Sequence, residues 1–482
     1  MTQYEPVIGL EVHAQIHTAS KMFCSCPVVD DTGDLPPNTY VCPICTGMPG
    51  VLPVINKQVI EKAIMTGLAL HCEIPNLSRF ARKSYFYPDL PKGYQISQYA
   101  LPLNVNGYLE IETENGLKRI GITRAHQEED AGKLYHANGM TYVDLNRAGV
   151  PLLEIVSEPD MRSVEEVHAY ATRLREILVY VGVNSGNLEQ GMMRFEANIS
   201  VRPVGSSALN PRHEVKNLNS FRALTRSVAY EIENQIAAIE AGETIVQQTM
   251  GWDDEQGVTV PQRSKEEAHD YRYFPEPDLP PLEIDPVWVD ELRARLPELP
   301  DAVRRRLIAD YGLSAYDTEV LMAEKAVRDY YDAAVAVSYD HRKTIANWIT
   351  GEVFRLMKER GEGIGEIQVS PKSLVELIQL VDASTINLNT GKTVLQAMLA
   401  TGQSAQQVVD QKGLAQISDT DALASLVSRV LDEHPDEVGE YLAGKEQLLG
   451  WLMGQVMRAS RGKANPQVVR ELLRETIEAR RT

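Results

Sequence analysis

The chain has 482 residues, of which 43% are hydrophobic and 24% are charged, and its formal net charge at pH 7 is −19. This composition is ordinary for a globular protein and excludes an intrinsically disordered chain. The negative balance also excludes a protein that holds nucleic acid through bulk positive charge, although a local basic patch remains compatible with it. No apolar run is long enough for a membrane span, and the first residues lack the basic and apolar regions of a signal peptide, so we expect a cytoplasmic protein.

The first predicted element is a strand at residues 6–17, along which apolar and polar side chains alternate. Its apolar face carries Ile8, Leu10, Val12, Ala14 and Ile16. Glu11 and His13 share the opposite face, where alternate residues lie about 6.6–7 Å apart. These two side chains can therefore reach one ion from neighbouring positions.

Four of the five cysteines form a Cys-Ser-Cys pair and a Cys-Pro-Ile-Cys pair joined by a loop. They are Cys24, Cys26, Cys42 and Cys45. Disulfides are disfavoured in a reducing cytoplasm, whereas four thiolates in two short pairs are typical of a closed, structural zinc site. The alternative is a cluster of buried free thiols. We interpret Cys72, which stands apart, as a core residue.

Helical spacing follows at residues 59–70, and Asn115-Gly116 then separates two strand-like runs and predicts a hairpin. Residues 80–94 and 270–278 mix Lys or Arg with Tyr and Phe. Either segment could hold phosphates or stack on a base, and the alternative is a surface loop anchored by aromatic side chains.

Ser163 and Glu166 predict a capping box at the start of an amphipathic helix, and residues 195–202 alternate as a further strand. We therefore expect an α+β fold. Residues 1–290 are expected to form its first domain, built on a mixed, largely antiparallel sheet.

Prolines cluster near residue 276, and strand signals nearly stop beyond that point. Residues 291–405 are interpreted as an all-α helical domain, with helices at 303–309 and 317–334. A run of short helices starting at Thr390-Gly391-Lys392 leads into a small α-helical tail domain, residues 406–482.

Carboxylates recur on the polar faces of the predicted strands. They are Glu11, Glu128, Glu129, Asp130, Glu154, Glu196 and Glu214. Oxygen ligands with one imidazole suit Mg²⁺ or Mn²⁺ better than zinc, and such an ion commonly bridges nucleotide phosphates. The alternative is that these residues are solvated faces of half-exposed strands, since exposed Glu is the default. Neither a P-loop nor a GxGxxG motif is present.

Six long motifs occur in a fixed order along the whole chain. They are Gly9-Leu-Glu-Val-His, Lys83-Ser-Tyr-Phe-Tyr-Pro-Asp, His126-Gln-Glu-Glu-Asp-Ala-Gly-Lys, Asp144-Leu-Asn-Arg-Ala-Gly-Val-Pro-Leu-Leu-Glu-Ile-Val-Ser-Glu-Pro-Asp, Glu214-Val-Lys-Asn-Leu-Asn-Ser-Phe-Arg and Ala459-Ser-Arg-Gly-Lys-Ala-Asn-Pro. Together they resemble the family of B subunits of bacterial aspartyl/glutamyl-tRNA(Asn/Gln) amidotransferases.

The resemblance implies a carbon–nitrogen ligase with glutamine as the amido donor. ATP would phosphorylate the side-chain carboxylate of Glu on tRNA(Gln), or of Asp on tRNA(Asn), and ammonia would then displace the phosphate. A carboxylate is a poor electrophile, so phosphorylation supplies the leaving group, and Mg²⁺ offsets the crowded charge. The sequence leaves open which of the two tRNAs is used.

The resemblance also implies site residues. The expected Mg²⁺ ligands are Glu11, His13, Glu129, Glu154 and Glu214, with Glu129 and Glu154 also catalytic. Lys83 and Lys92 are expected to be catalytic, and Tyr85, Arg194, Asn198 and Lys216 to bind ATP or the acyl substrate. The four cysteines match the family's zinc-containing branch. Glu196 stands where the family commonly has Asp after a Cys, and its role is left open.

No glutaminase signature is present, so the resemblance implies that ammonia comes from a separate amidase (glutaminase) partner, the A subunit, and that a small C subunit holds the pair. The misacylating aminoacyl-tRNA synthetase is a further expected partner. Residues 441–482 carry a net charge of +4, in contrast to the whole chain. We therefore expect Arg458, Arg461 and Lys463 to contact tRNA phosphates, the alternative being an ordinary basic helix surface.

Two other functions remain open at this point. A zinc-stabilised RNA-binding scaffold would have dispersed carboxylates and would not bind a nucleotide. A metal-dependent hydrolase would act without ATP or a partner.

Overall fold

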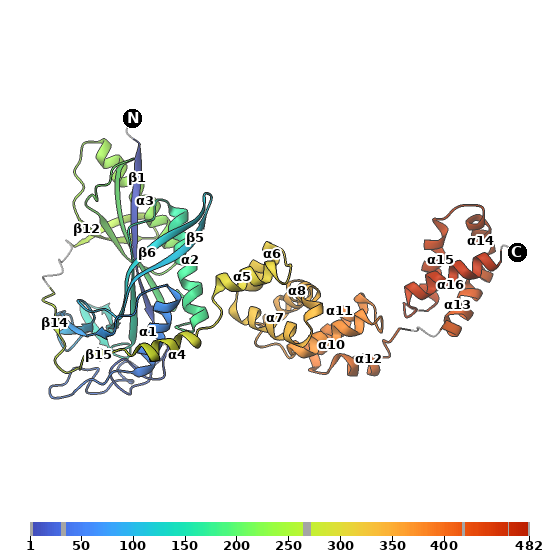
Figure 1. Ribbon diagram of the computed structural model, residues 1–482, viewed down its shortest axis with the longest axis horizontal. Coiled ribbons are helices and arrows are strands. Elements are labelled where there is room, and N and C mark those ends of the chain that lie inside the picture. The colour runs from blue at the N-terminus through green and yellow to red at the C-terminus, as the bar shows by residue number, and fades with distance from the viewer. Residues whose placement is uncertain (1–2, 30–34, 264–270, 417–419, 461, 481–482) are drawn as a thin grey trace. The chain divides into compact units, whose positions relative to one another are not determined.

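The computed structural model describes residues 3–29, 35–263, 271–416, 420–460 and 462–480 (Figure 1). The chain divides into two compact units, Met1–Pro300 and Asp301–Thr482, and each is described by itself. No helix within the described residues has the length and apolar character needed to cross a lipid bilayer.

The first unit is built on an eight-stranded sheet with the order β13-β12-β11-β10-β1-β9-β6-β5. Its strands are β1 (Tyr4–Gln15), β5 (Asn104–Thr113), β6 (Gly116–Glu129), β9 (Pro151–Ser157), β10 (Met193–Pro203), β11 (His213–Leu218), β12 (Gln248–Asp253) and β13 (Val258–Arg263). Every neighbouring pair is antiparallel except β11 and β12, which are parallel. The predicted mixed, largely antiparallel sheet is therefore confirmed.

Helices cover the apolar face of this sheet. They are α1 (Lys57–Ala69), α2 (Val164–Val181) and α3 (Phe221–Glu240), with α4 (Pro286–Ala294) packed on α1. Helix α2 packs on β5 and α3 packs on β10, so the core lies between this helical layer and the sheet. Leu10, Val12 and Ala14 of β1 are buried there, as the alternation predicts. Glu11 and His13 consequently point to the other face.

Three small sheets complete the first unit. One has the order β14-β3-β4, with β3 (Ala81–Ser84), β4 (Tyr94–Ser97) and β14 (Phe274–Pro275). The other two pair β2 (Leu77–Ser78) with β15 (Leu282–Glu283) and β7 (Lys133–Ala137) with β8 (Met140–Asp144). The first of these sheets joins the two predicted aromatic and basic segments, although they are far apart in the sequence.

Two local signals in the first unit behave nearly as predicted. The hairpin forms between β5 and β6, but Thr113 pairs with Gly116, so the turn lies at Glu114-Asn115. Ser163 caps α2 by accepting from the backbone N–H of Glu166. The Glu166 carboxylate reaches back to the N–H of Arg162 rather than to that of Ser163.

The second unit is helical, as expected. Its helices, with α5 starting at the boundary, are α5 (Pro300–Ala309), α6 (Ala315–Met322), α7 (Lys325–Val337), α8 (Arg342–Trp348), α9 (Phe354–Arg360), α10 (Pro371–Asp382), α11 (Leu388–Thr401), α12 (Ala405–Lys412), α13 (Thr420–Glu433), α14 (Pro435–Leu442), α15 (Leu448–Ala459) and α16 (Pro466–Ala479), with a 3₁₀ turn at Tyr339–His341 and a π-helical turn at Ile349–Val353. Helix α12 packs on α10 and α11, whereas α13–α16 share an apolar core of their own.

Two helix predictions in this unit were wrong in detail. The single helix expected at residues 317–334 is two helices, because the chain leaves helical geometry at Glu324, whose backbone is extended. Gly391 does not begin a helix but lies inside α11. A Cβ atom there would come within 2.9 Å of Val381 and 3.1 Å of Trp348, so glycine permits this close packing.

Candidate functional site

The polar face of the large sheet borders a cavity of about 480 Å³. Register brings the predicted residues together there: His13 of β1 lies opposite Glu154 of β9, and Glu11 lies opposite Glu196 of β10. Side chains directly opposite each other on neighbouring strands have Cβ atoms about 4.5–5.5 Å apart. Antiparallel pairing therefore assembles the site from segments that are distant in sequence.

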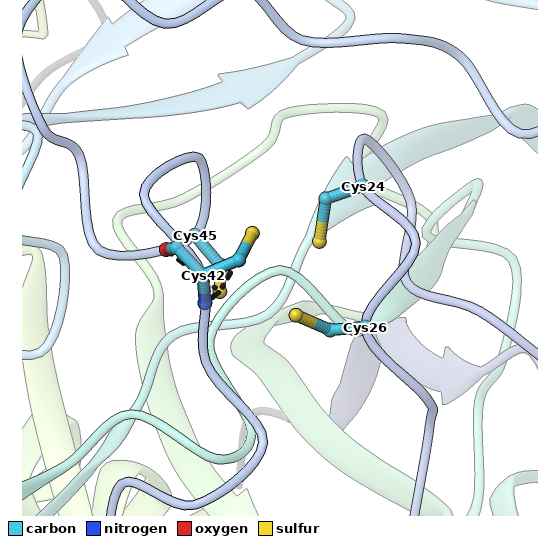
Figure 2. A group of neighbouring side chains, drawn as sticks. All are labelled: Cys24, Cys26, Cys42 and Cys45. Atoms are coloured by element: carbon cyan, nitrogen blue, oxygen red, sulfur yellow. Dashed lines mark hydrogen bonds between the residues drawn. The ribbon is translucent and has the colours of Figure 1, made fainter.

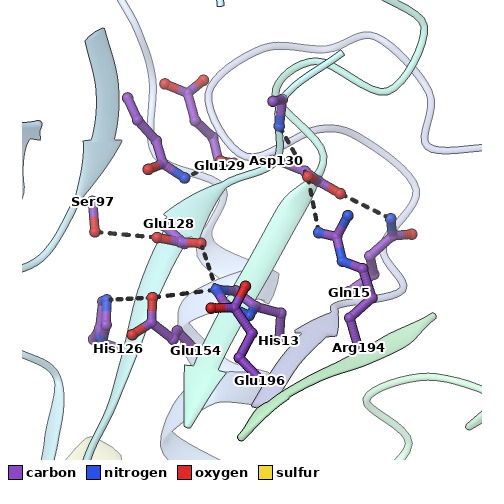
Figure 3. Close-up of polar contacts among 12 residues, drawn as sticks. His13, Gln15, Ser97, His126, Glu128, Glu129, Asp130, Glu154, Arg194 and Glu196 are labelled. Carbon is purple, nitrogen blue, oxygen red and sulfur yellow. Dashed lines mark hydrogen bonds and ion pairs between the residues drawn. The ribbon is translucent and has the colours of Figure 1, made fainter. Parts of the chain in front are cut away.

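One group of ligand atoms, which we call the histidine cluster, consists of His13, Glu128 and Glu154 (Figure 3). The Nε2 atom of His13 lies 3.6 Å from a Glu128 oxygen and 3.4 Å from a Glu154 oxygen. The ligand atoms of all three residues lie within 4.8 Å of one another. Two carboxylates and one imidazole at this spacing suit a hard divalent cation.

The electrostatics of the histidine cluster reflect this crowding. Burial opposes a charged imidazole, but the hydrogen bond to Glu154 and the surrounding negative charge raise the pKa of His13 to about 9. Burial and the charge of Glu154 raise the pKa of Glu128 to about 7. Without a cation, the cluster therefore holds protons that a bound metal ion would have to displace.

A second group, which we call the carboxylate cluster, consists of Glu11, Glu196 and Glu214, whose ligand oxygens also lie within 4.8 Å of one another. Burial and three neighbouring carboxylates raise the pKa of Glu11. Lys216 offsets part of the charge, with Nζ 2.6 Å from Glu196 and 3.4 Å from Glu214. Asn198 donates to Glu11 at 2.9 Å.

Five Lys or Arg side chains line the cavity, namely Lys83, Arg124, Arg194, Arg212 and Lys216, and three of them were expected from the sequence. Burial opposes the charge on Lys83, but Tyr273 and the cavity carboxylates raise its pKa above the usual range. Arg194 is held by Asp130, whose carboxylate is 3.1 Å from the guanidinium. The third expected cation is Lys216. The cavity thus places five Lys or Arg side chains around two acidic clusters. This arrangement can hold a metal ion together with phosphate or carboxylate groups.

Glu129 and Lys92 do not join this arrangement. They form an ion pair with each other, and the Glu129 carboxylate also accepts from the backbone N–H of Ile96 at 2.9 Å. Neither residue lines the cavity. Glu128, the neighbour of the expected metal ligand Glu129, is the residue whose ligand atoms lie near those of His13 and Glu154, because adjacent residues of a strand face opposite sides.

The remaining expected residues of the first unit lie close to the site. Tyr85 lines the cavity. Asn198 borders a separate pocket of about 140 Å³ that shares Glu11 and Arg212 with the cavity. Its Oδ1 atom is buried and has no hydrogen-bond partner among the described residues.

Several cavity residues were missed by the sequence analysis. The structure adds Arg124, His126, Arg212, Thr249, Tyr271 and Tyr273 to the lining. Burial lowers the pKa of His126 to about 4, so its imidazole is neutral at pH 7, with Nε2 3.6 Å from Glu154. His126 stands two residues before Glu128, and this spacing was the available signal that the two share a face.

The four predicted zinc ligands converge in the first unit (Figure 2). Their sulfur atoms all lie within 4.8 Å of one another, and those of Cys42 and Cys45 are 3.8 Å apart. A tetrahedral site with Zn–S bonds of 2.3 Å requires sulfur atoms about 3.8 Å apart, so the thiols fit this ion. The ammonium of buried Lys21 lies 3.9 Å from the sulfur of Cys45.

The electrostatics of the four thiols are unequal. The hydrogen bond with Cys45 and burial raise the pKa of Cys24, and burial raises the pKa of Cys26 to about 11. A hydrogen bond from Cys24, the N–H of Cys42 and the charge of Lys21 lower the pKa of Cys45 to about 5. Cys72 lies apart in the apolar core, where burial raises its pKa to about 12.

In the tail, Arg458 is exposed in the last turn of α15, and Lys463 is exposed just after it. Arg461, the third residue expected to contact tRNA, lies outside the described residues.

Known protein families and relatives match this chain over almost its whole length. A family model described as the GatB/GatE catalytic domain matches residues 6–290, and a model described as the GatB domain matches residues 329–477. The chain is 50% identical over 476 residues to the B subunit of the aspartyl/glutamyl-tRNA(Asn/Gln) amidotransferase of Thermoanaerobacter pseudethanolicus, a match that covers 98% of this chain and 99% of that protein. It is 52% identical over 479 residues to the protein of the same name from Moorella thermoacetica, covering 98% of this chain and all of the relative.

Proposed function

The chain belongs to the family of aspartyl/glutamyl-tRNA(Asn/Gln) amidotransferase B subunits, and from this membership and the cavity we propose that it activates the side-chain carboxylate of an amino acid carried by a misacylated tRNA. ATP phosphorylates Glu on tRNA(Gln) or Asp on tRNA(Asn), and ammonia then displaces the phosphate to give the amide. The overall reaction is that of a carbon–nitrogen ligase with glutamine as the amido donor.

The observation that carries this proposal is the convergence of both acidic clusters and five Lys or Arg side chains in one cavity. ATP and a carboxylate substrate are both anionic, so their reacting groups repel each other unless charge is offset. The donor set of the histidine cluster suits Mg²⁺, which would supply that positive charge. The carboxylate cluster offers a second set of oxygen ligands.

The chain's own cations have distinct proposed roles. Lys83 faces both Glu128 and Glu154, and its raised pKa keeps it positive at neutral pH, so it can neutralise a phosphoryl or substrate oxygen. Asp130 fixes the orientation of the Arg194 guanidinium, which suits bidentate binding of phosphate. Lys216 limits the repulsion within the carboxylate cluster.

We assign Lys92 and Glu129 a positioning role behind the cavity wall. Their ion pair and the N–H of Ile96 tie the end of β6 to β4. This places Glu128, on the neighbouring position, against His13.

The four thiols converge at a spacing that supports zinc. Four thiolates would fill the coordination sphere of the ion and leave no open position, so its role is structural. Ammonia is proposed to come from the amidase partner, the A subunit, with a small C subunit completing the assembly. The relatives are named as the B subunit of an amidotransferase, and this name supports the presence of partner subunits. The misacylating synthetase is a further proposed neighbour, and the cytoplasm is the expected compartment.

The RNA-binding scaffold requires dispersed carboxylates, and six carboxylate and imidazole ligands gathered in two clusters argue against it. A hydrolase that acts alone is argued against by the near full-length likeness to one component of a larger enzyme.

The test is Mg²⁺-dependent ATP turnover by the complex of this chain with its amidase and small subunits. Glu-tRNA(Gln) and Asp-tRNA(Asn) are supplied separately, and correctly charged Gln-tRNA(Gln) is the control. We expect misacylated tRNA to stimulate turnover by the wild type and not by Glu154→Gln, which keeps the shape of the side chain. Stimulation that persists at the wild-type rate in a folded Glu154→Gln complex would contradict the proposed site.

A further inference from the structure

A further pocket of about 80 Å³ adjoins the acidic cavity, and Tyr99 and Tyr273 belong to the walls of both. Their rings are stacked, with centroids 4.2 Å apart and planes inclined by 8°. Tyr99 follows β4 and Tyr273 precedes β14, so pairing of β14 with β3 and of β3 with β4 joins the two segments. The stacked tyrosines therefore form a boundary between the cavity and this pocket, which we call the rim pocket.

The rim pocket is aromatic and carries one cation. Phe274 and Tyr99 are 46% and 42% exposed, although large apolar rings are normally covered in a folded chain. Arg79 also lines the pocket, and its guanidinium has neither an ion pair nor a hydrogen bond within the part of the chain that the structure describes. Exposed aromatic rings beside the Arg79 guanidinium suit an unpaired nucleotide. Its base would stack on the rings, and its phosphate would bind the guanidinium.

The position of the rim pocket beside the acidic cavity indicates which nucleotide it would bind. This step rests on the proposed function, which places the side-chain carboxylate of the aminoacyl group in the acidic cavity. That amino acid is esterified to the ribose of the terminal adenosine, so the terminal base is tethered to the reacting carboxylate through one ribose and one amino acid. The 3′ end of a tRNA is single-stranded, and unpaired bases are commonly recognised by stacking on aromatic side chains.

We propose that the rim pocket binds the unpaired 3′-terminal adenosine of the aminoacyl-tRNA, with its base on Tyr99 and Phe274 and a phosphate on Arg79. The stacked pair of Tyr99 and Tyr273 then orients the acyl end toward the histidine cluster. The adenine of ATP has the same stacking chemistry, so the experiment must separate the two sources.

The binding arm uses the full chain in complex with its amidase and small subunits, and uncharged tRNA(Gln) with 2-aminopurine in place of the terminal adenine. Stacking on aromatic rings quenches this fluorophore. We expect quenching by the wild type, retention of quenching by Tyr99→Phe, and loss of quenching by Tyr99→Leu and Phe274→Leu. Tyr135→Leu is the matched control, because Tyr135 is another exposed tyrosine, on β7, and lies outside both pockets.

The kinetic arm measures the KM for misacylated tRNA and the KM for ATP separately. Each ring removal should raise the KM for tRNA by about 5-fold or more and leave the KM for ATP unchanged. Arg79→Gln should raise the KM for tRNA in a salt-dependent way. A wild type without fluorescence quenching, a rise in the KM for ATP instead, or loss of the three-subunit complex in these variants would each overturn the proposal. Because the fluorescence arm requires no turnover, it decides the proposal even if the proposed reaction fails.

Discussion

Glu128 and Glu129 have opposite environments although they are adjacent. Glu128 faces His13 at 3.6 Å, whereas Glu129 is paired with Lys92 behind the cavity wall. The same substitution at the two positions should therefore separate metal binding from folding.

Glu128→Gln should lower tRNA-stimulated ATP turnover roughly 100-fold or more, because it removes a proposed metal ligand. Its free energy of unfolding should change by less than about 1 kcal/mol, since the lost charge lies in a crowded acidic cluster. Glu129→Gln should instead cost about 3–5 kcal/mol of stability, because it leaves Lys92 buried without its partner. Thermal unfolding and ATP turnover of both variants check this. Loss of turnover in a stable Glu129→Gln variant, with normal turnover in Glu128→Gln, would show that Glu129 is the metal ligand.

The titrating groups of the histidine cluster predict pH-dependent metal binding. The pKa values of His13 and Glu128 are about 9 and about 7, and a metal ion requires both groups to be deprotonated. The affinity for Mn²⁺ or Mg²⁺ should therefore rise as the pH is raised from 6 to 9, with release of protons. Calorimetry in buffers of different ionisation enthalpy counts these protons, and a pH-independent affinity would show that the cluster does not bind the ion.

At the scale of elements, the sequence was sufficient to predict the strands and helices with regular hydrophobic patterns. Alternation in β1 predicted both faces of the central strand, because one face is buried and the other lines a cavity. The side chains of β6 could not be assigned in this way. Ile120 and Ile122 face the core, but a bulge between Ile122 and Arg124 shifts the register, so that Ala125 faces the core instead. The bulge is what turns Glu128 toward the cavity and Glu129 away from it.

The convergence of the site residues could not be derived from sequence spacing, because it depends on strand order. Glu11 and Glu196 meet only because β1 pairs with β10, and Lys83 reaches the cavity from a separate small sheet. The cysteine spacing, in contrast, was enough to predict a four-thiol cluster, since each pair is local and a single loop brings the pairs together.

Zinc bound by Cys24, Cys26, Cys42 and Cys45 should stabilise the fold of the first unit. Purified protein is expected to hold one zinc ion, and Cys42→Ser should abolish binding and lower the midpoint of thermal unfolding. Cys72→Ser is the control, because Cys72 lies outside the cluster and should leave the zinc content unchanged. Elemental analysis alongside thermal unfolding checks this, and full zinc content in Cys42→Ser would contradict the assigned ligands.

At the scale of the molecule, charge is unevenly distributed. The chain carries −19 overall, whereas residues 441–482 carry +4. Binding of an anionic tRNA should therefore depend on local contacts in the tail rather than on the average field.

The double variant Arg458→Gln, Lys463→Gln should weaken binding of tRNA and reduce the slope of log affinity against log salt by about 1 for each lost phosphate contact. The kcat at saturating tRNA should stay unchanged, because the proposed chemistry lies in the other unit. Binding titrations over a range of salt concentrations check this. An unchanged slope would mean that these two side chains do not contact phosphate.

The central claim is that the acidic cavity phosphorylates the substrate carboxylate, and oxygen transfer tests it most directly. Glu-tRNA(Gln) labelled with ¹⁸O in the side-chain carboxylate is given to the complete complex with ATP, Mg²⁺ and glutamine. Phosphorylation turns one carboxylate oxygen into the bridging oxygen, and attack by ammonia releases it with phosphate. We predict one labelled phosphate for each amide formed by the wild type and none from Glu154→Gln. Amide formation with unlabelled phosphate, or full transfer by a folded Glu154→Gln complex, would contradict the account.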